Sequence, residues 1–524
     1  MASQPHFQTD DEASNLTSFE VNFQDDADDA ADKHGGGGLL RPSRMCHLAV
    51  LSTSFWAFVL FLHYSSTQGG GGGVASALFK QSAFSLPPLL SGSTVGRGRT
   101  PPAQPPPDPA TQGGRSVTAA GDRCAGRYIY MYDLPPRFND DLVRDCKKLW
   151  RFYDMCPLLA NFGMGRLLGD EGGVFAPRGW YVTNQFTLDL IFHARMKRYE
   201  CLTDDPSLAA AVYVPFYASL DGGRHMWNST SLRDMLGLDL VEWLAQRPQW
   251  RAMGGRDHFM VAGRIAWDFR RYEDVDEHWG TRLLNFPAVQ NMTVLVLETN
   301  PWGGTNLAVP YPTYFHPETA ADVAAWQEKV RKLERTWLFS FAGSNHPWAP
   351  NTVRPQIFEQ CGASSRCKLF RCDSGRSANN CKVPSAVMRV FESSAFCLQP
   401  RGDSLTRRST FDAILAGCIP VFFHPGSAHT QYTLHLPRDD PNRWSVLIMH
   451  TDVTERNVSI EETLTKIPPE TVKTMREEVI RLIPRVVYAD PRSRRIDFKD
   501  AFDVAVEAVI DRVARRRRGD VEAR

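Results

Sequence analysis

The chain has 524 residues, of which 43% are hydrophobic and 23% are charged, and its formal net charge is +1. This length exceeds one ordinary domain and predicts two domains of similar size with additional segments. The balanced charge argues against a nucleic-acid-binding protein, which is usually strongly basic, and against a strongly acidic solvating chain.

The N-terminal region has the pattern of a membrane anchor. Residues 1–44 are polar and glycine-rich, which predicts a disordered tail. Residues 45–64 contain no Asp, Glu, Lys or Arg, and a helix of that length spans about 30 Å, the thickness of a hydrocarbon core. Arg41 and Arg44 precede this segment, and no Lys or Arg follows before Lys80. The positive-inside rule therefore predicts a cytosolic tail and a single-pass type II protein with a lumenal C-terminal part.

Residues 65–123 are rich in Gly, Ser and Pro and are predicted to form a flexible stem. The folded part is expected to begin at Cys124. Ten of the eleven cysteines lie between Cys124 and Cys418. An even number of cysteines in this part is compatible with disulfides in an oxidising compartment.

From Cys124 onward, short apolar runs alternate with helical patterns. The predicted strands are Tyr128–Tyr132, Ala211–Tyr217, His258–Gly263, Thr293–Glu298, Trp337–Ala342, Ala395–Leu398, Ile419–Phe423 and Val446–Met449. The predicted helices include Asn184–Arg198, Asp322–Arg335 and Phe498–Val513. Such alternation indicates an α/β fold with parallel sheets. We predict two Rossmann-like domains facing a cleft, over residues 124–330 and 331–524.

The segment from Ala395 to Phe423 carries the most chemical information. It reads as strand, loop, helix and strand, with a helix predicted over Thr410–Ala416 and Ser409 as its N-cap. A helix that begins at the carboxyl end of a parallel strand favours an anionic ligand.

Three arginines, Arg401, Arg407 and Arg408, crowd the same loop, and guanidinium groups match the geometry of phosphates. Asp412 follows about one turn into the helix, where a carboxylate can accept hydrogen bonds from ribose hydroxyls. Together these residues predict a nucleotide diphosphate site. The alternative is that the arginines pair with Asp403 and Asp412 and only stabilise the start of the helix.

Longer motifs connect this segment to a known family. They include YIYMYDLPPRFN at 128–139, RDHFMVAGRIAWDFRR at 256–271 and FFHPGSAHTQYTLHLP at 422–437. Together with the loop–helix segment, these motifs resemble the exostosin-like glycosyltransferases, above all the plant branch that contains xyloglucan galactosyltransferases. The resemblance covers nearly all of residues 124–513.

The resemblance implies a GT-B fold, an inverting mechanism and a UDP-sugar donor. In this branch the donor is usually UDP-galactose and the acceptor a xylosyl side chain of xyloglucan, while related enzymes use UDP-galacturonate or UDP-arabinopyranose. It also implies residence in the Golgi membrane and complexes with other wall glycosyltransferases. The predicted donor-binding residues are Gly343, Arg401, Asp403, Ser404, Arg407, Arg408, Ser409 and Asp412.

An inverting transferase needs a base that accepts the proton of the acceptor hydroxyl. The candidates are Asp268 and His258, followed by Asp221 and His225. Asp268 is preferred because a carboxylate beside Trp267 can have its pKa raised by partial burial. Stacking on sugar rings is a further candidate role, with core packing as its alternative, for Trp267, Trp348 and Tyr432.

No metal or other cofactor is expected. The triplet Asp274-Val-Asp276 lies in a charged run, which favours a solvated loop over a Mn²⁺ site. Four clustered cysteines lack a C-x-x-C pair, so disulfides are favoured over zinc for Cys361, Cys367, Cys372 and Cys381.

Two further interpretations remain open at this point. One is a non-catalytic scaffold that holds partner transferases in the Golgi, and the other is a transferase of the same fold that acts on a different wall polysaccharide. Sequons that permit N-glycosylation occur in the lumenal part at Asn228, Asn291 and Asn457.

Overall fold

The computed structural model describes residues 122–169, 172–300, 306–345, 352–373, 381–493 and 496–520. The predicted tail, the apolar segment 45–64 and the stem up to residue 121 lie outside the described residues. Within the described part of the chain, no helix is both long and apolar enough to cross a membrane.

The first sheet has six parallel strands in the order β2-β1-β3-β4-β5-β6. Its longest strands, β4 and β5, are buried along almost their whole length because helices cover both faces of a parallel sheet. The strand bounds are Ile129–Met131 (β1), Leu202–Thr203 (β2), Ala211–Tyr213 (β3), His258–Ile265 (β4), Thr293–Glu298 (β5) and Leu307–Ala308 (β6).

The second sheet has five parallel strands in the order β11-β10-β9-β7-β8. Both sheets belong to the same compact unit of the chain. The strand bounds are Trp337–Gly343 (β7), Cys367–Arg371 (β8), Ser394–Gln399 (β9), Ile419–Phe422 (β10) and Val446–Leu447 (β11). The predicted α/β class with two parallel sheets is therefore confirmed.

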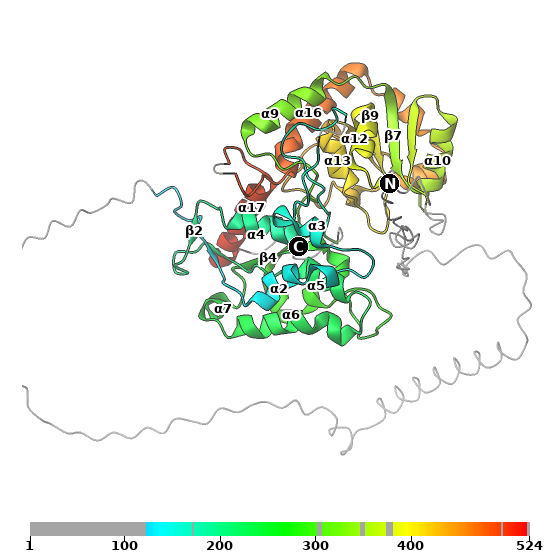
Figure 1. Ribbon diagram of the computed structural model, residues 1–524. Coiled ribbons are helices and arrows are strands. Elements are labelled where there is room, and N and C mark those ends of the chain that lie inside the picture. The colour runs from blue at the N-terminus through cyan, green and yellow to red at the C-terminus, as the bar shows by residue number, and fades with distance from the viewer. Residues whose placement is uncertain are drawn as a thin grey trace, which may run out of the picture. The chain divides into compact units, whose positions relative to one another are not determined.

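Helices surround each sheet (Figure 1). Those of the first half, residues 122–308, are α2 (Asp140–Arg144), α3 (Cys156–Leu159), α4 (Leu188–Met196), α5 (Ala218–His225), α6 (Thr230–Ala245), α7 (Pro248–Met253) and α8 (Pro287–Asn291). Those of the second half, residues 320–486, are α9 (Ala320–Lys332), α10 (Arg354–Ala363), α12 (Pro384–Glu392), α13 (Ser409–Leu415), α14 (His450–Thr454), α15 (Ile460–Thr465) and α16 (Pro469–Val486).

The closing helix α17 (Ala501–Arg518) packs against the first half, although it follows the second half in the sequence (Figure 1). Phe502 contacts the ring of Phe192 on α4, with ring centroids 4.6 Å apart. Arg195, also on α4, forms a buried ion pair with Asp500 at 3.2 Å. The helix also packs against α16 of the second half, so it contacts both halves. The division of the folded part into residues 124–330 and 331–524 stays a prediction.

The predicted strands recur in the structure with small shifts at their ends. The largest shift is at β3, which was predicted to reach Tyr217 and ends at Tyr213. Pro215 lies in this interval, and proline cannot donate a hydrogen bond to a neighbouring strand. The short strands β2 and β6, the half-exposed β8 and the long helix α16 were not predicted.

Ten cysteines form five disulfides. The four clustered cysteines form Cys361–Cys367 and Cys372–Cys381, so the preference for disulfides over zinc is confirmed. The other pairs are Cys124–Cys201, Cys146–Cys156 and Cys397–Cys418.

Candidate active site

The strand order of the second sheet reverses between β7 and β9, and open α/β sheets bind ligands outside the carboxyl ends of their strands at such a point. Gly343 ends β7, and Arg401 lies just beyond the end of β9. Arg354, the first residue of α10, joins the two loops. Its Nε donates to the carbonyl of Arg401 and its Nη1 to the carbonyl of Ser344, both at 2.8 Å. Two predicted donor-binding residues therefore flank the switch point.

Gly343 lies where a side chain does not fit. A Cβ atom there would lie 2.5 Å from the Phe341 ring and 3.2 Å from Nη1 of Arg354. The absence of a side chain thus lets Arg354 reach the end of β7.

The loop after β9 is held partly by its own charges. The Nη2 atom of Arg407 lies 3.0 Å from the Asp403 carboxylate. The Arg407 guanidinium lies directly over Gly402. A Cβ atom on Gly402 would lie only 1.8 Å from Nη2 of Arg407 and would overlap it. Burial lowers the pKa of the Arg407 guanidinium. The nearby Asp403, Tyr311 and Glu298 raise it by more, so this pKa lies above its usual value.

Arg408 connects the two halves of the molecule. Its Nη1 donates to the carbonyl of Thr183, and its guanidinium lies 3.6 Å from the centre of the Tyr314 ring. Its Nε also lies 3.4 Å from the Asp412 carboxylate, and burial raises the pKa of Asp412 to about 6. The pairs Arg407–Asp403 and Arg408–Asp412 are those of the alternative interpretation, so these residues do stabilise the start of α13.

Several buried polar atoms around this loop nevertheless have no hydrogen-bond partner among the described residues. They are Nε2 of Gln399, Nε of Arg401, Nη2 of Arg408, Oδ1 of Asp412 and Oγ of Ser427, while Nε of Arg408 has only the ion pair with Asp412. A buried polar group without a partner costs about 1–3 kcal/mol. The loop–helix segment therefore has hydrogen-bonding capacity beyond that used by its internal ion pairs.

The start of α13 differs from the prediction. Arg408, not Ser409, is the N-cap residue, and it makes no side-chain cap. The hydroxyl of Ser409 instead donates to Oε1 of Gln399 at 2.7 Å. Because α13 has only seven residues, attraction of an anion here depends on the arginine side chains more than on the helix.

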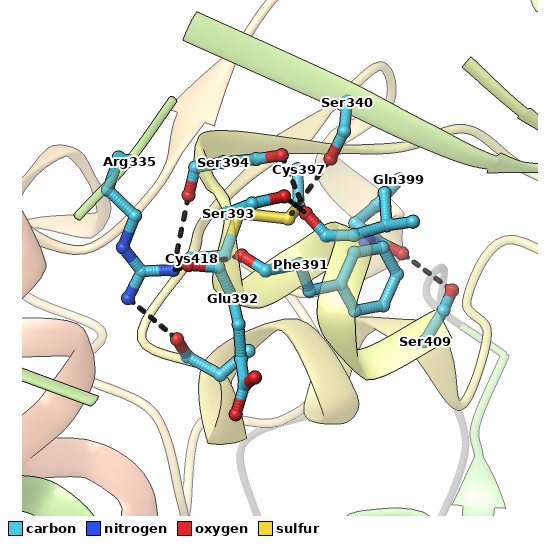
Figure 2. The surroundings of a disulfide bond; sticks show 12 residues. Arg335, Ser340, Phe391, Glu392, Ser393, Ser394, Cys397, Gln399, Ser409 and Cys418 are labelled. Atoms are coloured by element: carbon cyan, nitrogen blue, oxygen red, sulfur yellow. Dashed lines mark hydrogen bonds between the residues drawn. A yellow bond between two sulfur atoms is a disulfide. The ribbon is translucent and has the colours of Figure 1, made fainter. Parts of the chain in front are cut away.

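Covalent and hydrogen bonds hold the two ends of the same segment (Figure 2). The disulfide Cys397–Cys418 links β9 to the residue before β10, and both cysteines are fully buried. The guanidinium of Arg335 donates to five nearby carbonyls, those of Val330, Phe391, Glu392, Ser394 and Ala416, at 2.7 to 3.4 Å. The loop–helix segment thus begins and ends at fixed points.

In the first half, Asp268 directly follows the carboxyl end of β4, in a 3-10 helix over Ala266–Phe269. The carboxylate is buried and both oxygens accept hydrogen bonds, from Nε of Arg264 at 2.6 Å and from Nε1 of Trp279 at 2.8 Å. Trp267 beside it is 38% exposed. Asp268 therefore lies at the edge of the sheet expected for the base, but it is also a structural hydrogen-bond acceptor.

His258 lies at the opposite end of the same strand. It is the first residue of β4, is fully buried, and contacts the hydroxyl of Tyr132 at 3.0 Å and the carboxylate of Asp257 at 2.7 Å. Eight strand residues separate the two ends of β4 by roughly 25 Å. Asp268 and His258 cannot both act on one reacting bond, and of the two only Asp268 is at the carboxyl edge.

The remaining acid–base candidates lie on α5. Asp221 is buried and pairs with Arg224 at 3.0 Å, and burial raises its pKa to about 6. His225 is partly buried, and burial lowers its pKa. Their roles stay predictions.

Three further predictions concern Tyr432 and Trp348, as residues that stack on sugars, and the triplet that begins at Asp274. Tyr432 is fully buried and donates to the carbonyl of Leu297, so it packs in the core and does not stack on a sugar. Trp348 lies outside the described residues. Asp274 pairs with Arg271 and Arg282, which agrees with the interpretation of its triplet as a charged loop.

Comparisons with known proteins identify the family of the chain. Residues 123–464 match the Exostosin GT47 domain. The chain is 46% identical to xyloglucan galactosyltransferase MUR3 of Arabidopsis thaliana, over 93% of this chain and 85% of that protein. This chain belongs to the exostosin GT47 family.

Two further relatives from Arabidopsis thaliana show how the family varies. Xyloglucan galactosyltransferase XLT2 is 40% identical, over 75% of this chain and 76% of that protein. Xyloglucan-specific galacturonosyltransferase 1 is 39% identical, over 75% of this chain and 58% of that protein. The chain is thus a GT47 glycosyltransferase whose relatives differ in the sugar named.

One residue in contact with the candidate site was not singled out from the sequence. Glu298 ends β5 and is 5% exposed, yet its carboxylate accepts three hydrogen bonds from the loop after β9. The signal was present in the sequence as an acidic residue that closes an otherwise apolar strand. Only the structure shows that this strand end lies against the other half.

A cavity of about 490 Å³ lies between the first half of this GT47 chain and the segment after α16. Its walls come from α2, α4, Tyr217, Pro491 and Arg492, and Phe162, which also lines it, is 52% exposed. This volume falls within the roughly 300–1,000 Å³ of ligand pockets. The apolar and cationic lining can contact both the faces and the hydroxyl groups of sugars.

Proposed function

We propose that this GT47 enzyme transfers galactose from UDP-galactose to xylosyl side chains of xyloglucan, with inversion at the anomeric carbon, in a GT-B arrangement. The concentration of arginines and unpartnered buried polar atoms at the switch point of the second sheet carries this proposal. The names of the relatives MUR3 and XLT2 support galactose as the sugar and xyloglucan as the acceptor.

In the proposed reaction, a hydroxyl oxygen of the acceptor forms a bond to the anomeric carbon of the donor. The bond from that carbon to the β-phosphate oxygen breaks, and UDP leaves with the electron pair. Arg401 and Arg407 offset the charge that develops on the diphosphate. Asp268, at the carboxyl edge of the first sheet, is the proposed acceptor of the hydroxyl proton.

Asp412 and the cavity complete the proposal. The unpartnered Oδ1 of Asp412 is available to accept a hydrogen bond from a ribose hydroxyl. The cavity beside Phe162 is proposed to hold part of the xyloglucan chain.

We further propose that transfer needs no metal and takes place in the Golgi lumen, on a protein anchored by residues 45–64. Five disulfides support an oxidising compartment.

A donor-by-acceptor screen tests the proposal. Purified full-length protein is given UDP-galactose, UDP-galacturonate or UDP-arabinopyranose with xylosylated glucan oligosaccharides, with and without EDTA. We expect transfer from UDP-galactose alone, undiminished by EDTA, with a product of inverted anomeric configuration by NMR. Transfer from UDP-galacturonate only would reassign the donor, and the absence of any transfer or donor hydrolysis would favour the scaffold.

A further inference from the structure

Glu298 makes an unusual connection between the two halves of the molecule. The residue ends β5 in the first sheet, while its three hydrogen-bond donors belong to the loop after β9 in the second half. Oε1 accepts from the backbone N–H of Leu405 at 2.9 Å. Oε2 accepts from the hydroxyl of Ser404 at 2.8 Å and from the N–H of Thr406 at 3.2 Å.

We propose that Glu298 is a positioning residue for the nucleotide-sugar donor: from the first half, it holds the loop after β9 in the conformation that presents Arg401 and Arg407 to the diphosphate. This inference rests on the proposed donor site. Leu405 and Thr406 occupy a turn of the loop, and Glu298 satisfies both of their backbone N–H groups. Without the carboxylate, these two donors would lose their partners, one of them in a buried and one in a partly buried place.

A second set of contacts continues from the same strand end. The N–H of Thr299 donates to Oε1 of Gln431 at 3.0 Å, and Nε2 of Gln431 donates to Oγ1 of Thr406 at 3.1 Å. Thr406 in turn donates to the carbonyl of Ser427, in the segment after β10. Glu298 thus belongs to a closed ring of hydrogen bonds that joins the end of β5 to the loops after β9 and β10.

The charged and titratable groups around Glu298 predict that its hold on the loop after β9 depends on pH. The groups that face it are Arg407 in the loop, Tyr311 after β6 and Tyr432 after β10. Burial raises the pKa of Glu298 to about 7, against the hydrogen bond from Ser404 and the charge of Arg407, which lower it. The ionised carboxylate accepts the three hydrogen bonds most strongly, because a proton removes its charge and turns one acceptor site into a donor. The loop is therefore held more firmly as the pH rises through about 7.

The first half offers a matched control. Asp189 on α4 is also buried, and burial raises the pKa of its carboxyl to about 7. Asp189 likewise accepts three hydrogen bonds, from the N–H and the hydroxyl of Ser219 and from the N–H of Gly263. All of these donors lie in its own half. Asp189→Asn therefore reproduces the chemical change of Glu298→Gln without touching the loop after β9.

The experiment measures UDP binding by calorimetry and the kinetics of transfer for full-length wild type, Glu298→Gln and Asp189→Asn. In Glu298→Gln we expect UDP affinity to fall by about 30-fold and the donor KM to rise in proportion. We also expect the acceptor KM to change less than about twofold, and the decrease in kcat/KM below pH 7 to disappear. Asp189→Asn is expected to lower the melting temperature and to leave UDP affinity unchanged.

The outcomes separate the positioning role from the proposed function. Wild-type protein that does not bind UDP overturns the donor assignment and the role of Glu298 with it. Wild-type binding of UDP combined with unchanged binding by Glu298→Gln overturns only the role of Glu298. Equal losses of UDP affinity in both variants would show a general effect of destabilisation and also overturn it. If Glu298→Gln does not fold, Ser404→Ala removes one of the three hydrogen bonds and is expected to weaken UDP binding by roughly fivefold. Unchanged binding in that variant is then the overturning result.

Discussion

The two halves differ in the hydrogen bonding of the polar side chains at the carboxyl ends of their strands. At the end of β4 in the first half, Asp268 has both carboxylate oxygens engaged, with Arg264 and Trp279. Around the loop after β9 in the second half, Arg408 and Asp412 retain buried polar atoms without a partner in the described structure. A polar group that is already satisfied orients its neighbours, whereas an unsatisfied one can bind a ligand without first losing an internal contact.

The comparison also shows where the halves depend on each other. The loop after β9 obtains three hydrogen bonds from Glu298, and Arg408 reaches the carbonyl of Thr183. The loop that carries the unpartnered groups around Arg408 and Asp412 is thus held in place by residues of the first half. Substitutions in the second half are expected to affect the donor site, and substitutions in the first half are expected to affect proton transfer and acceptor binding.

The largest effect is expected for Arg401→Ala. This change removes a charge from the diphosphate site and should lower kcat by about 10³-fold. The fold should remain, because Arg354 binds the backbone carbonyl of Arg401 and not its side chain. Steady-state kinetics with UDP-galactose and circular dichroism measure the two results. Arg438→Ala, at an exposed arginine of the same half, is the control. Transfer at the wild-type rate by Arg401→Ala would contradict the assigned site.

Asp268→Asn addresses the first half. If Asp268 takes the proton of the acceptor, kcat should fall by about 10²-fold with little change in the donor KM. His258→Gln, at the other end of β4, should lower the melting temperature and leave kcat almost unchanged. Loss of kcat in His258→Gln with normal turnover in Asp268→Asn would reverse the assignment. Melting temperatures of both variants show how much of each effect is structural.

Removal of the Cys397–Cys418 disulfide should affect both stability and the donor site. The double change to Ala opens a segment of 21 residues and should cost about 3 kcal/mol of unfolding free energy. Because this disulfide encloses the loop and α13, the donor KM should also rise severalfold. The double change at Cys146 and Cys156, with a separation of 10 residues in the first half, should lower stability without changing the donor KM. Thermal unfolding and donor kinetics of the two double variants are compared. Equal donor KM values would show that the disulfide around the loop and α13 does not affect donor binding.

The smallest effect is expected at the cavity lined by Phe162. Phe162→Ala removes an exposed aromatic ring from its edge and should cost about 1 kcal/mol of acceptor binding, or roughly fivefold in acceptor KM. The donor KM should stay unchanged. Leu238→Ala, at another exposed apolar residue of the same half, is the control. An unchanged acceptor KM for Phe162→Ala would exclude this cavity from the acceptor site.

Much of the secondary structure could be predicted because the buried strands are long and apolar. The run Thr293–Glu298 was predicted with its correct bounds as β5, and His258–Gly263 was only two residues short of β4. β8 was missed because its residues are mostly part-exposed and two of its five are basic, so its pattern differs little from that of a loop. The amphipathic helix α16 contains an internal proline, Pro484, which is normally a sign that a helix ends.

For the site, the sequence by itself determined the composition of the loop from Arg401 to Asp412, because local clustering of charge is visible without a fold. Only the tertiary structure decided which of those groups are paired, that His258 and Asp268 lie at opposite ends of one strand, and that α17 returns to the first half. Only the structure brings Glu298 to a loop more than 100 residues away. The physical reason is that hydrogen bonding and burial depend on distances in space, which strand order and helix packing set and local residue patterns do not record.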